Sequence, residues 1–473
     1  MGTLAGHSEM MIENRVFDEI AVGETASVTR TVRQEDIDLF AVVSGDVNPT
    51  HLDPAYATTD LFHHVIIHGM WGAGLISSVL GTQLPGPGTI YLGQGLRFHR
   101  HVGIGDTITA TVTVTEKRAD KGDLLLDCRC INQDGVTVIT GTAEVKAPTA
   151  KVRRPRIELP DVRLSRHERF RTLLARTAGR RVTAAVAYPC DEATLGAALD
   201  AAAAGLIAPI LVGPEATIRA AAGAAGLDIA ACRIVPAADA VEAAARAVAL
   251  VRAGEAALLM KGALHTDVLM HAVAATETGL RTARRLSHIY LMDVPAYPRP
   301  LLITDAAINI SPSLEEKRDI VQNAIDLAHV MGITMPRVAI LSAVETINPK
   351  LRSTLDAASL CKMADRGQIT GGLVDGPLAF DNAVSMAAAR EKGIVSTVAG
   401  RADILVVPDL EAGNMLAKQL TFLAGADAAG VVLGARVPII LTSRADSERT
   451  RIASCAVAVL LADAHATDHP GAG

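Results

Sequence analysis

A strictly alternating stretch at residues 106–115 constrains the fold of this chain more than any other feature. Threonines there alternate with small or branched apolar residues, namely Ile108, Ala110, Val112 and Val114. A period of two is typical of an antiparallel β-strand that buries one face and exposes the other. Residues 124–131 and 136–145 have the composition of neighbouring strands, and the Asp134-Gly135 turn between them predicts a hairpin.

One long helix is expected beside this sheet. Residues 66–80 are apolar without alternation, and Gly81 and Pro85 end the run. A helix packed against a curled antiparallel sheet accounts for residues 10–147. We therefore predict an α+β domain over residues 1–147.

The hydrophobic pattern is lost between residues 147 and 166, where proline, arginine and lysine are frequent. We expect a linker over residues 148–164. Its basic run, residues 151–156, has two interpretations: a phosphate-binding arm or a solvated linker. The run is short and Pro155 interrupts it, which favours the linker.

Residues 165–473 alternate instead between short apolar strands and helical stretches. The best-marked helix starts at Ser313, which forms a capping-box pattern with Glu316, and runs to Met331. Strands that alternate with helices predict a mostly parallel sheet covered on both faces, which is an α/β fold. The expected strands are 182–187, 210–212, 257–260, 338–341, 404–407, 431–433 and 438–442.

The composition excludes several classes of function. A formal net charge of −6 gives no general attraction to nucleic acid. The six cysteines include no C-x-x-C pattern, as expected of buried residues in a reducing compartment. Residues 61–96 lack charged side chains, but their prolines and glycines make a poor membrane span. With no signal-like N-terminal segment, we expect a cytoplasmic protein without membrane or nucleic-acid partners.

The first group of chemically useful residues lies in the loop at residues 44–51. Gly45-Asp46 and Asn48-Pro49 are turn formers, so the loop should be ordered. Asp46 and His51 can then converge on one small volume and hold a water molecule between a carboxylate and an imidazole. The alternative is a turn capped by Asp46 with an incidental histidine.

The whole string, Gly45-Asp46-Val-Asn48-Pro-Thr-His51, resembles the signature of the MaoC-like, (R)-specific enoyl-CoA hydratases. The resemblance extends through residues 67–70 and 98–107 and covers about residues 12–147. It implies a dimeric hot-dog fold with acyl-CoA at the dimer interface. It further implies that Asp46 and His51 share the proton transfers and that the Gly69 N–H stabilises the enolate oxygen. Asn48 borders the substrate and holds the loop in shape.

The histidines at positions 63, 64 and 68 could indicate a metal site. No acidic residue or cysteine completes a ligand set near them along the chain, and the implied hydration needs no metal. We therefore expect no metal and no permanently bound cofactor.

Several polar strings of the second half form the other group of chemically useful residues. Taken singly they are turns and caps. In this order they resemble the phosphate acetyl/butyryltransferases, nearest to the butyryltransferase branch, over about residues 165–465. The family implies two α/β subdomains, 165–285 plus 430–473 and 286–430, with a coenzyme A cleft between them. The strings are residues 260–267, 304–310, 342–345, 374–383, 402–408, 411–414 and 441–447.

The resemblance implies acyl transfer between coenzyme A and phosphate. Arg444 would bind phosphate through its planar guanidinium, and Ser443 would hydrogen-bond the thioester carbonyl or the thiol. Asp375, Asp381 and Asp446 are the expected substrate-binding carboxylates. Two positions depart from relatives: Thr450 replaces an aspartate of the acetyltransferase branch, and His271 replaces an arginine. The base is therefore unassigned, with Asp446 and Asp381 as candidates.

The sequence thus predicts a bifunctional enzyme whose substrates are coenzyme A thioesters and phosphate. One alternative is a hydratase with a non-catalytic, coenzyme A-sensing and oligomerising C-terminal module. Another is a hot-dog thioesterase, against which the complete 45–51 signature argues. Because both halves are expected to pair, we predict a homodimer or a larger homo-oligomer.

Overall fold

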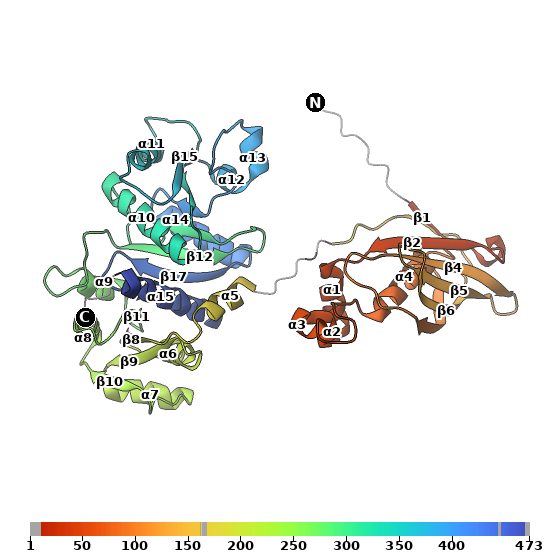
Figure 1. Cartoon of the computed structure of the whole chain (residues 1–473), viewed down its shortest axis with the longest axis horizontal. Coiled ribbons are helices and arrows are strands. Elements are labelled where there is room, and N and C mark those ends of the chain that lie inside the picture. The colour runs from red at the N-terminus through yellow and green to blue at the C-terminus, as the bar shows by residue number, and fades with distance from the viewer. Residues whose placement is uncertain (1–10, 161, 163–167, 443–445, 469–473) are drawn as a thin grey trace. The chain divides into compact units, whose positions relative to one another are not determined.

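The computed structural model of the chain describes residues 11–160, 162, 168–442 and 446–468. The chain divides into two compact units, Met1–Arg166 and His167–Gly473, drawn in red to orange and in yellow to blue in Figure 1. Each unit has its own hydrophobic core.

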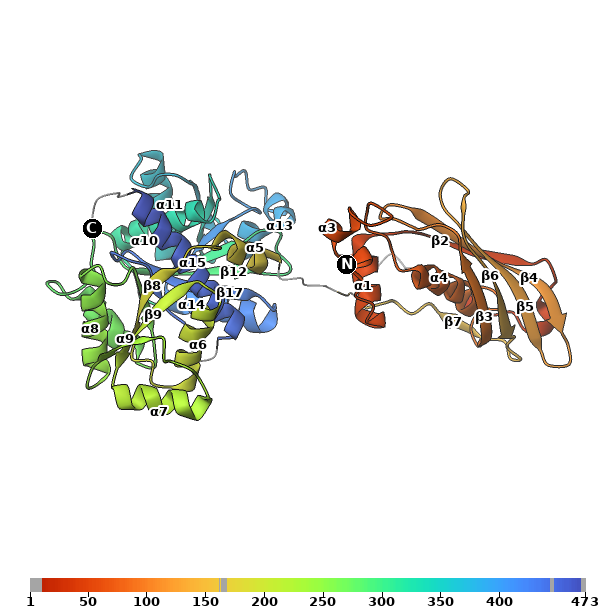
Figure 2. The same cartoon turned by 60° about the horizontal axis from the view of Figure 1, so that its bottom comes forward.

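The N-terminal unit consists of a five-stranded antiparallel sheet and a helix packed on its inner face (Figure 2). The helix is α4 (Gly69–Thr82), which buries Trp71, Ile76 and Val79 against the sheet. The strand order is β2-β4-β5-β6-β3. Their bounds are β2 (Thr25–Thr31), β3 (Ile90–Phe98), β4 (Thr107–Arg118), β5 (Asp123–Ile131) and β6 (Thr137–Lys146).

The hot-dog fold is as predicted, and the alternation at residues 106–115 has its expected consequence: Ile108, Ala110, Val112 and Val114 of β4 are buried and the threonines between them are not. Gly72 of α4 permits close packing on the sheet, since a Cβ there would lie 2.4 Å from Ile139 Cδ1. The helix begins at Gly69 rather than at residue 66. Ile66 instead pairs with Gly103 in an isolated β-bridge, and the Ile67 N–H donates to the Val102 carbonyl.

The first part of the expected linker has regular structure. Strand β7 (Arg153–Pro155) pairs with β1 (Met11–Glu13). The buried Asn14 side chain donates to the carbonyls of Pro87 and Ala150 and accepts from the Val152 N–H. A three-residue strand is too short to show a periodic pattern, which is why β7 was not predicted.

Three short helices and a 3₁₀ turn complete this unit. They are η1 (Phe17–Glu19), α1 (Gln34–Ser44), α2 (Pro49–Leu52) and α3 (Pro54–Ala57).

The second unit is built on one eleven-stranded sheet, in the order β10-β9-β8-β11-β18-β17-β12-β13-β16-β14-β15. Three neighbouring pairs are antiparallel: β12 with β13, β12 with β17, and β17 with β18. All other neighbouring strands are parallel, which confirms the prediction of a mostly parallel sheet. Helices cover the sheet (Figure 1). The strand bounds are β8 (Val182–Ala187), β9 (Ile207–Gly213), β10 (Arg233–Pro236), β11 (Leu258–Lys261), β12 (Ser287–Asp293), β13 (Leu301–Thr304), β14 (Arg337–Leu341), β15 (Leu373–Leu378), β16 (Ile404–Val406), β17 (Asp427–Leu433) and β18 (Ile439–Ile440).

Helix α10 (Leu314–Val330) begins as predicted at Ser313, whose hydroxyl accepts from the Glu316 N–H while the Glu316 carboxylate accepts from the Ser313 N–H. No helix of the described residues is both long and apolar enough to cross a membrane. The subdomain boundaries stay a prediction. The other helices are α5 (Glu168–Arg176), α6 (Glu192–Ala203), α7 (Glu215–Ala225), α8 (Ala240–Arg252), α9 (Thr266–Ala274), α11 (Arg352–Asp365), α12 (Phe380–Val384), α13 (Met386–Glu391), α14 (Leu410–Leu423) and α15 (Glu448–Asp468).

Candidate active sites

The loop between α1 and α2 carries the first site. Helix α1 ends at Gly45, which has φ of 73°, a conformation that glycine adopts without strain. Asp46 follows, and its Oδ1 accepts from the Asn48 N–H at 3.2 Å. Asn48 caps α2 by accepting from the Thr50 N–H, and Pro49 is the first helical residue. The predicted ordered turn is therefore present.

His51 presents a free lone pair. Its Nδ1 lies 2.8 Å from the Ile66 carbonyl oxygen, which can only accept a hydrogen bond. Nδ1 therefore carries the proton in the neutral ring, and Nε2 is left as an acceptor.

His68 is the third member of the site, and the sequence analysis did not assign it a role. The residue is only 2% exposed, and its Nε2 lies 3.0 Å from the Asp46 carbonyl oxygen. By the same reasoning Nε2 donates, so Nδ1 holds the lone pair. Nδ1 is buried and has no hydrogen-bond partner among the described residues. The rings of His51 and His68 lie against each other, with centroids 3.9 Å apart.

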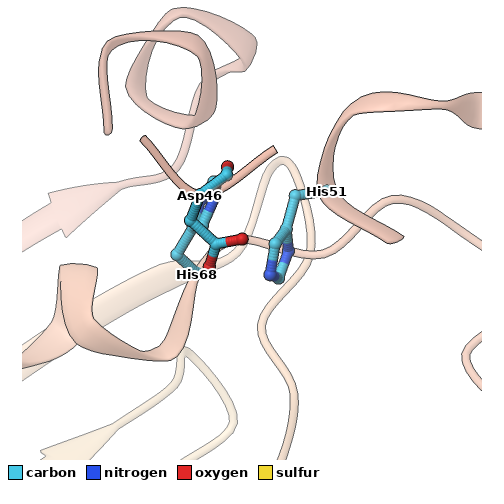
Figure 3. A group of neighbouring side chains, drawn as sticks. All are labelled: Asp46, His51 and His68. Atoms are coloured by element: carbon cyan, nitrogen blue, oxygen red, sulfur yellow. Dashed lines mark hydrogen bonds between the residues drawn. The ribbon is translucent and has the colours of Figure 1, made fainter. Parts of the chain in front are cut away.

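Asp46, His51 and His68 meet in one small volume, as Figure 3 shows. A carboxylate oxygen and one nitrogen of each ring all lie within 4.8 Å of one another. The fold thus brings the Asp46 carboxylate close to His68, although no acidic residue lies near His68 along the chain. The signal that pointed to His68 was its place in the string 67–70. The expected absence of a metal stays a prediction.

A cavity of about 380 Å³ opens beside these residues. It is lined by His51, His68 and Gly69 together with apolar side chains that include Trp71 and Ile139. Gly69 is the first residue of α4, so its N–H has no acceptor within the helix and lies at the positive end of the helix dipole. A Cβ at this position would approach Phe98 Cε1 to 3.0 Å.

Ser443 and Arg444, the predicted catalytic pair of the second unit, lie outside the described residues. Asp446 follows them, half-buried just before α15. It lies close to Tyr290 of β12: burial first, and the Asp446 charge second, raise the pKa of the Tyr290 hydroxyl to about 12.

Thr450, which replaces an aspartate of relatives, takes part in the start of α15. Its N–H donates to the Ser447 hydroxyl at 3.1 Å, and the two hydroxyl oxygens lie 3.0 Å apart. The side chain is 7% exposed. A threonine hydroxyl is no base at neutral pH, so position 450 supports the helix and does not supply the missing proton acceptor.

A charged group lies where β14 and β15 end. The Glu345 carboxylate pairs with Lys392 and accepts from the Asn382 amide at 3.0 Å. The Lys392 ammonium also lies 3.7 Å from the Asp381 carboxylate. The hydrogen bond that Lys392 donates to Glu345 raises the pKa of Lys392, so this cation stays charged. No sequence signal pointed to Lys392.

The strings 304–310 and 411–414 meet at the end of β13. The Asp305 carboxylate accepts from the N–H groups of Ala307, Ile308 and Asn309, and burial raises its pKa. The Asn414 amide donates to the Ala306 carbonyl at 3.3 Å. These contacts shape the loop.

The three predicted substrate-binding carboxylates have different surroundings. Asp381 belongs to the Lys392 group, and Asp446 lies near Tyr290. Asp375, half-buried in β15, lies near Cys361, whose thiol pKa is raised to about 12, first by burial and then by the Asp375 charge. The described residues do not join the three into one site.

Two family models match separate parts of the chain. The model described as "Phosphate acetyl/butaryl transferase" matches residues 237–459, and the model described as "MaoC like domain" matches residues 19–124. The second unit thus has the fold and the motifs of a phosphotransacylase.

Relatives of known name are consistent with this class. The phosphate acetyltransferase of Rhizobium meliloti is 67% identical over 277 residues, which cover 59% of this chain and 88% of the relative. A branched-chain phosphotransacylase from Enterococcus faecalis V583 matches in structure with a TM-score of 0.53 and 31% identity, over 59% of this chain and 99% of its own. The R-hydratase PhaJ1 from Pseudomonas aeruginosa matches with a TM-score of 0.32 and 44% identity, over 33% of this chain and 100% of its own.

The chain therefore belongs to the phosphate acetyl/butyryltransferase family, and its N-terminal unit carries a MaoC-like hot-dog domain.

Proposed function

We propose that the chain is a bifunctional enzyme of acyl-CoA metabolism. Its N-terminal unit would hydrate trans-2-enoyl-CoA reversibly to (R)-3-hydroxyacyl-CoA. Its C-terminal unit would transfer an acyl group, acetyl or butyryl, reversibly between coenzyme A and phosphate. The observation that carries the hydratase half is the meeting of Asp46 with the open Nε2 of His51 beside an apolar cavity.

In the hydration step, Asp46 and His51 hold one water molecule between them. One of them takes a proton from the water as its oxygen attacks C3 of the enoyl chain, and the same proton is then delivered to C2. Negative charge that develops on the thioester oxygen is stabilised by the N–H of Gly69 at the start of α4. Proton transfer alone is worth about 10²–10⁴-fold in rate.

In the transfer step, the coenzyme A thiol loses its proton to a base, and the thiolate attacks the acyl phosphate carbonyl, with phosphate as the leaving group. Arg444 binds the phosphate and Ser443 the thioester carbonyl or thiol. We assign Asp446 as the base. It follows the Ser443–Arg444 pair closely, whereas Asp381, the other candidate, lies near the Lys392 ammonium.

Two assays on the full-length chain test the proposal. Crotonyl-CoA should lose its enoyl absorbance on addition of enzyme, and butyryl-CoA with phosphate should give butyryl phosphate and free thiol. Inactivity in one assay removes that half of the proposal and leaves the other.

A second candidate keeps the hydratase but makes the C-terminal unit a non-catalytic module that senses coenzyme A and assembles the chain. The observation in its favour is that Thr450, where relatives have an aspartate, only hydrogen-bonds the capping residue Ser447 at the start of α15. Coenzyme A binding without any acyl phosphate formation would support it.

A further inference from the structure

We propose that Asp46, His51 and His68 form a binding site for zinc or a similar divalent transition metal ion, which reversibly blocks the hydratase site. The binding rests only on the geometry of the three side chains. The proposal that the metal inhibits hydration rests in addition on the proposed hydratase function.

Each of the three side chains places one possible ligand atom within 4.8 Å of those of the other two. The Ile66 carbonyl fixes the proton of His51 on Nδ1, and the Asp46 carbonyl fixes that of His68 on Nε2. Each ring therefore presents its other nitrogen unprotonated. Carbonyl groups that orient ligating imidazoles in this way are the usual second partners of metal-bound histidine.

The buried lone pair of His68 is an independent indication of a ligand. This nitrogen is withdrawn from solvent and has no partner in the described part of the chain. Buried polar atoms are nearly always satisfied, so an unpartnered one at a cavity wall calls for a water or an ion. The His51 ring lies against the His68 ring, with centroids 3.9 Å apart, and Asp46 belongs to the same group.

The donor set suits zinc. Two imidazoles and one carboxylate are the ligands of many zinc sites that keep a fourth position open. Ligand atoms about 2.1 Å from a tetrahedral ion lie about 3.4 Å apart, whereas the three atoms here lie within 4.8 Å. Asp46 is exposed and only its Oδ1 has a described partner, so its side chain is free to close this gap. Nitrogen ligands disfavour calcium and magnesium, which prefer oxygen.

An ion held there would use the atoms that the hydration needs. The Asp46 carboxylate and the His51 Nε2 would ligate the metal and would no longer accept a proton. Zinc should therefore inhibit hydration and leave acyl phosphate formation, a reaction of the other unit, unaffected.

The test is binding of zinc to the full-length chain, by isothermal titration, together with the visible spectrum of the cobalt(II) form. Variants Asp46→Asn and His51→Gln remove one ligand each. His63→Gln is the matched control, because His63 is an exposed histidine outside the group. Both activities are then assayed with and without zinc, and again after a chelator.

We expect the wild-type chain to bind one zinc ion. Binding should be at least tenfold weaker in Asp46→Asn and in His51→Gln and unchanged in His63→Gln. The cobalt(II) spectrum should show no thiolate charge-transfer band. Hydration should fall with zinc and recover with chelator. No zinc binding, or binding unchanged in both ligand variants, would overturn the site. If zinc binds there and stimulates hydration, the proposal that the metal inhibits the hydratase site is wrong. Hydration that proceeds without any zinc binding leaves the hydratase function standing, and zinc binding without hydratase activity leaves the site standing.

Discussion

The residues of the proposed hydratase site come from one stretch of chain, 46–69, whereas the motifs of the phosphotransacylase unit are spread over residues 260–447. In the first case, turns and two short helices bring the side chains together, and hydrogen bonds between near neighbours fix them. In the second case, polar strings follow the ends of strands that are far apart in sequence.

This difference decides what each substitution should do. A site made from one ordered loop concentrates its chemistry in a few side chains. A site distributed over strand ends depends on the whole sheet, so single changes in its supporting groups should have smaller effects.

The largest effect is expected from Asp46→Asn and His51→Ala. Each should lower crotonyl-CoA hydration by at least about a hundredfold, because proton transfer assistance is lost. Acyl phosphate formation should be unchanged, and Asp120→Asn, in an exposed turn, is the control. Near-normal hydration in both variants would show that the loop is not the catalytic site.

A smaller effect, about tenfold or more, is expected from Arg444→Lys on the use of phosphate. Lysine keeps the charge but cannot make the two parallel hydrogen bonds of a guanidinium. The measurement is the rate of butyryl phosphate formation against phosphate concentration, with hydration as the internal control. If even Arg444→Ala leaves this rate unchanged, the phosphate site lies elsewhere.

The two edges of the hot-dog sheet also differ, because one is polar and the other is apolar. Edge strand β2 is composed mainly of threonine, serine and arginine, whereas edge strand β3 exposes Ile90 and Leu92 at 56% and 48%. We expect the fragment 1–160 to dimerise through β3, and Leu92→Lys to make it monomeric by light scattering. A wild-type fragment that is monomeric yet hydrates crotonyl-CoA would contradict the dimeric site.

The contacts of Asn14 predict that the hot-dog unit extends past residue 147. A fragment 1–150 lacks Val152 and β7, so part of the buried Asn14 side chain loses its partners. It should be about 2 kcal/mol less stable than fragment 1–160. Fluorescence of Trp71, the only tryptophan, reports unfolding of this unit. Equal denaturation midpoints would mean that residues 151–160 add nothing to the unit.

Sequence patterns predicted the parts of the fold that local chemistry determines. The alternation in β4 and the Ser313 capping box both gave the observed elements. Eight strands were missed: β1, β2, β3 and β7 in the first unit, and β10, β12, β13 and β15 in the second. In β15 the cause is visible, since Gly376 and Pro377 are strand breakers that the sheet overrides. The Asp46–His51 turn was predictable from its loop, whereas Lys392 and the role of His68 depend on tertiary contacts that no spacing reveals.

The last prediction concerns His288 of β12, a buried group to which neither proposed reaction assigns a role. Its ring is fully buried against Tyr290 and Gly430, and neither nitrogen has a partner among the described residues. Burial lowers the pKa of His288 to about 3. An unfolded histidine has a pKa of about 6.5, so below that pH the unfolded chain binds a proton that the folded chain refuses. Stability from this residue is present above pH 6.5 and is lost as the pH falls towards 3, by roughly 1 kcal/mol per pH unit.

In fragment 165–473, His288→Gln should therefore flatten the decline in unfolding free energy between pH 6.5 and 4.5, measured by denaturant titration. The exposed His271→Gln should leave the slope as it is, and parallel curves for all three proteins would show that His288 does not cause the acid sensitivity.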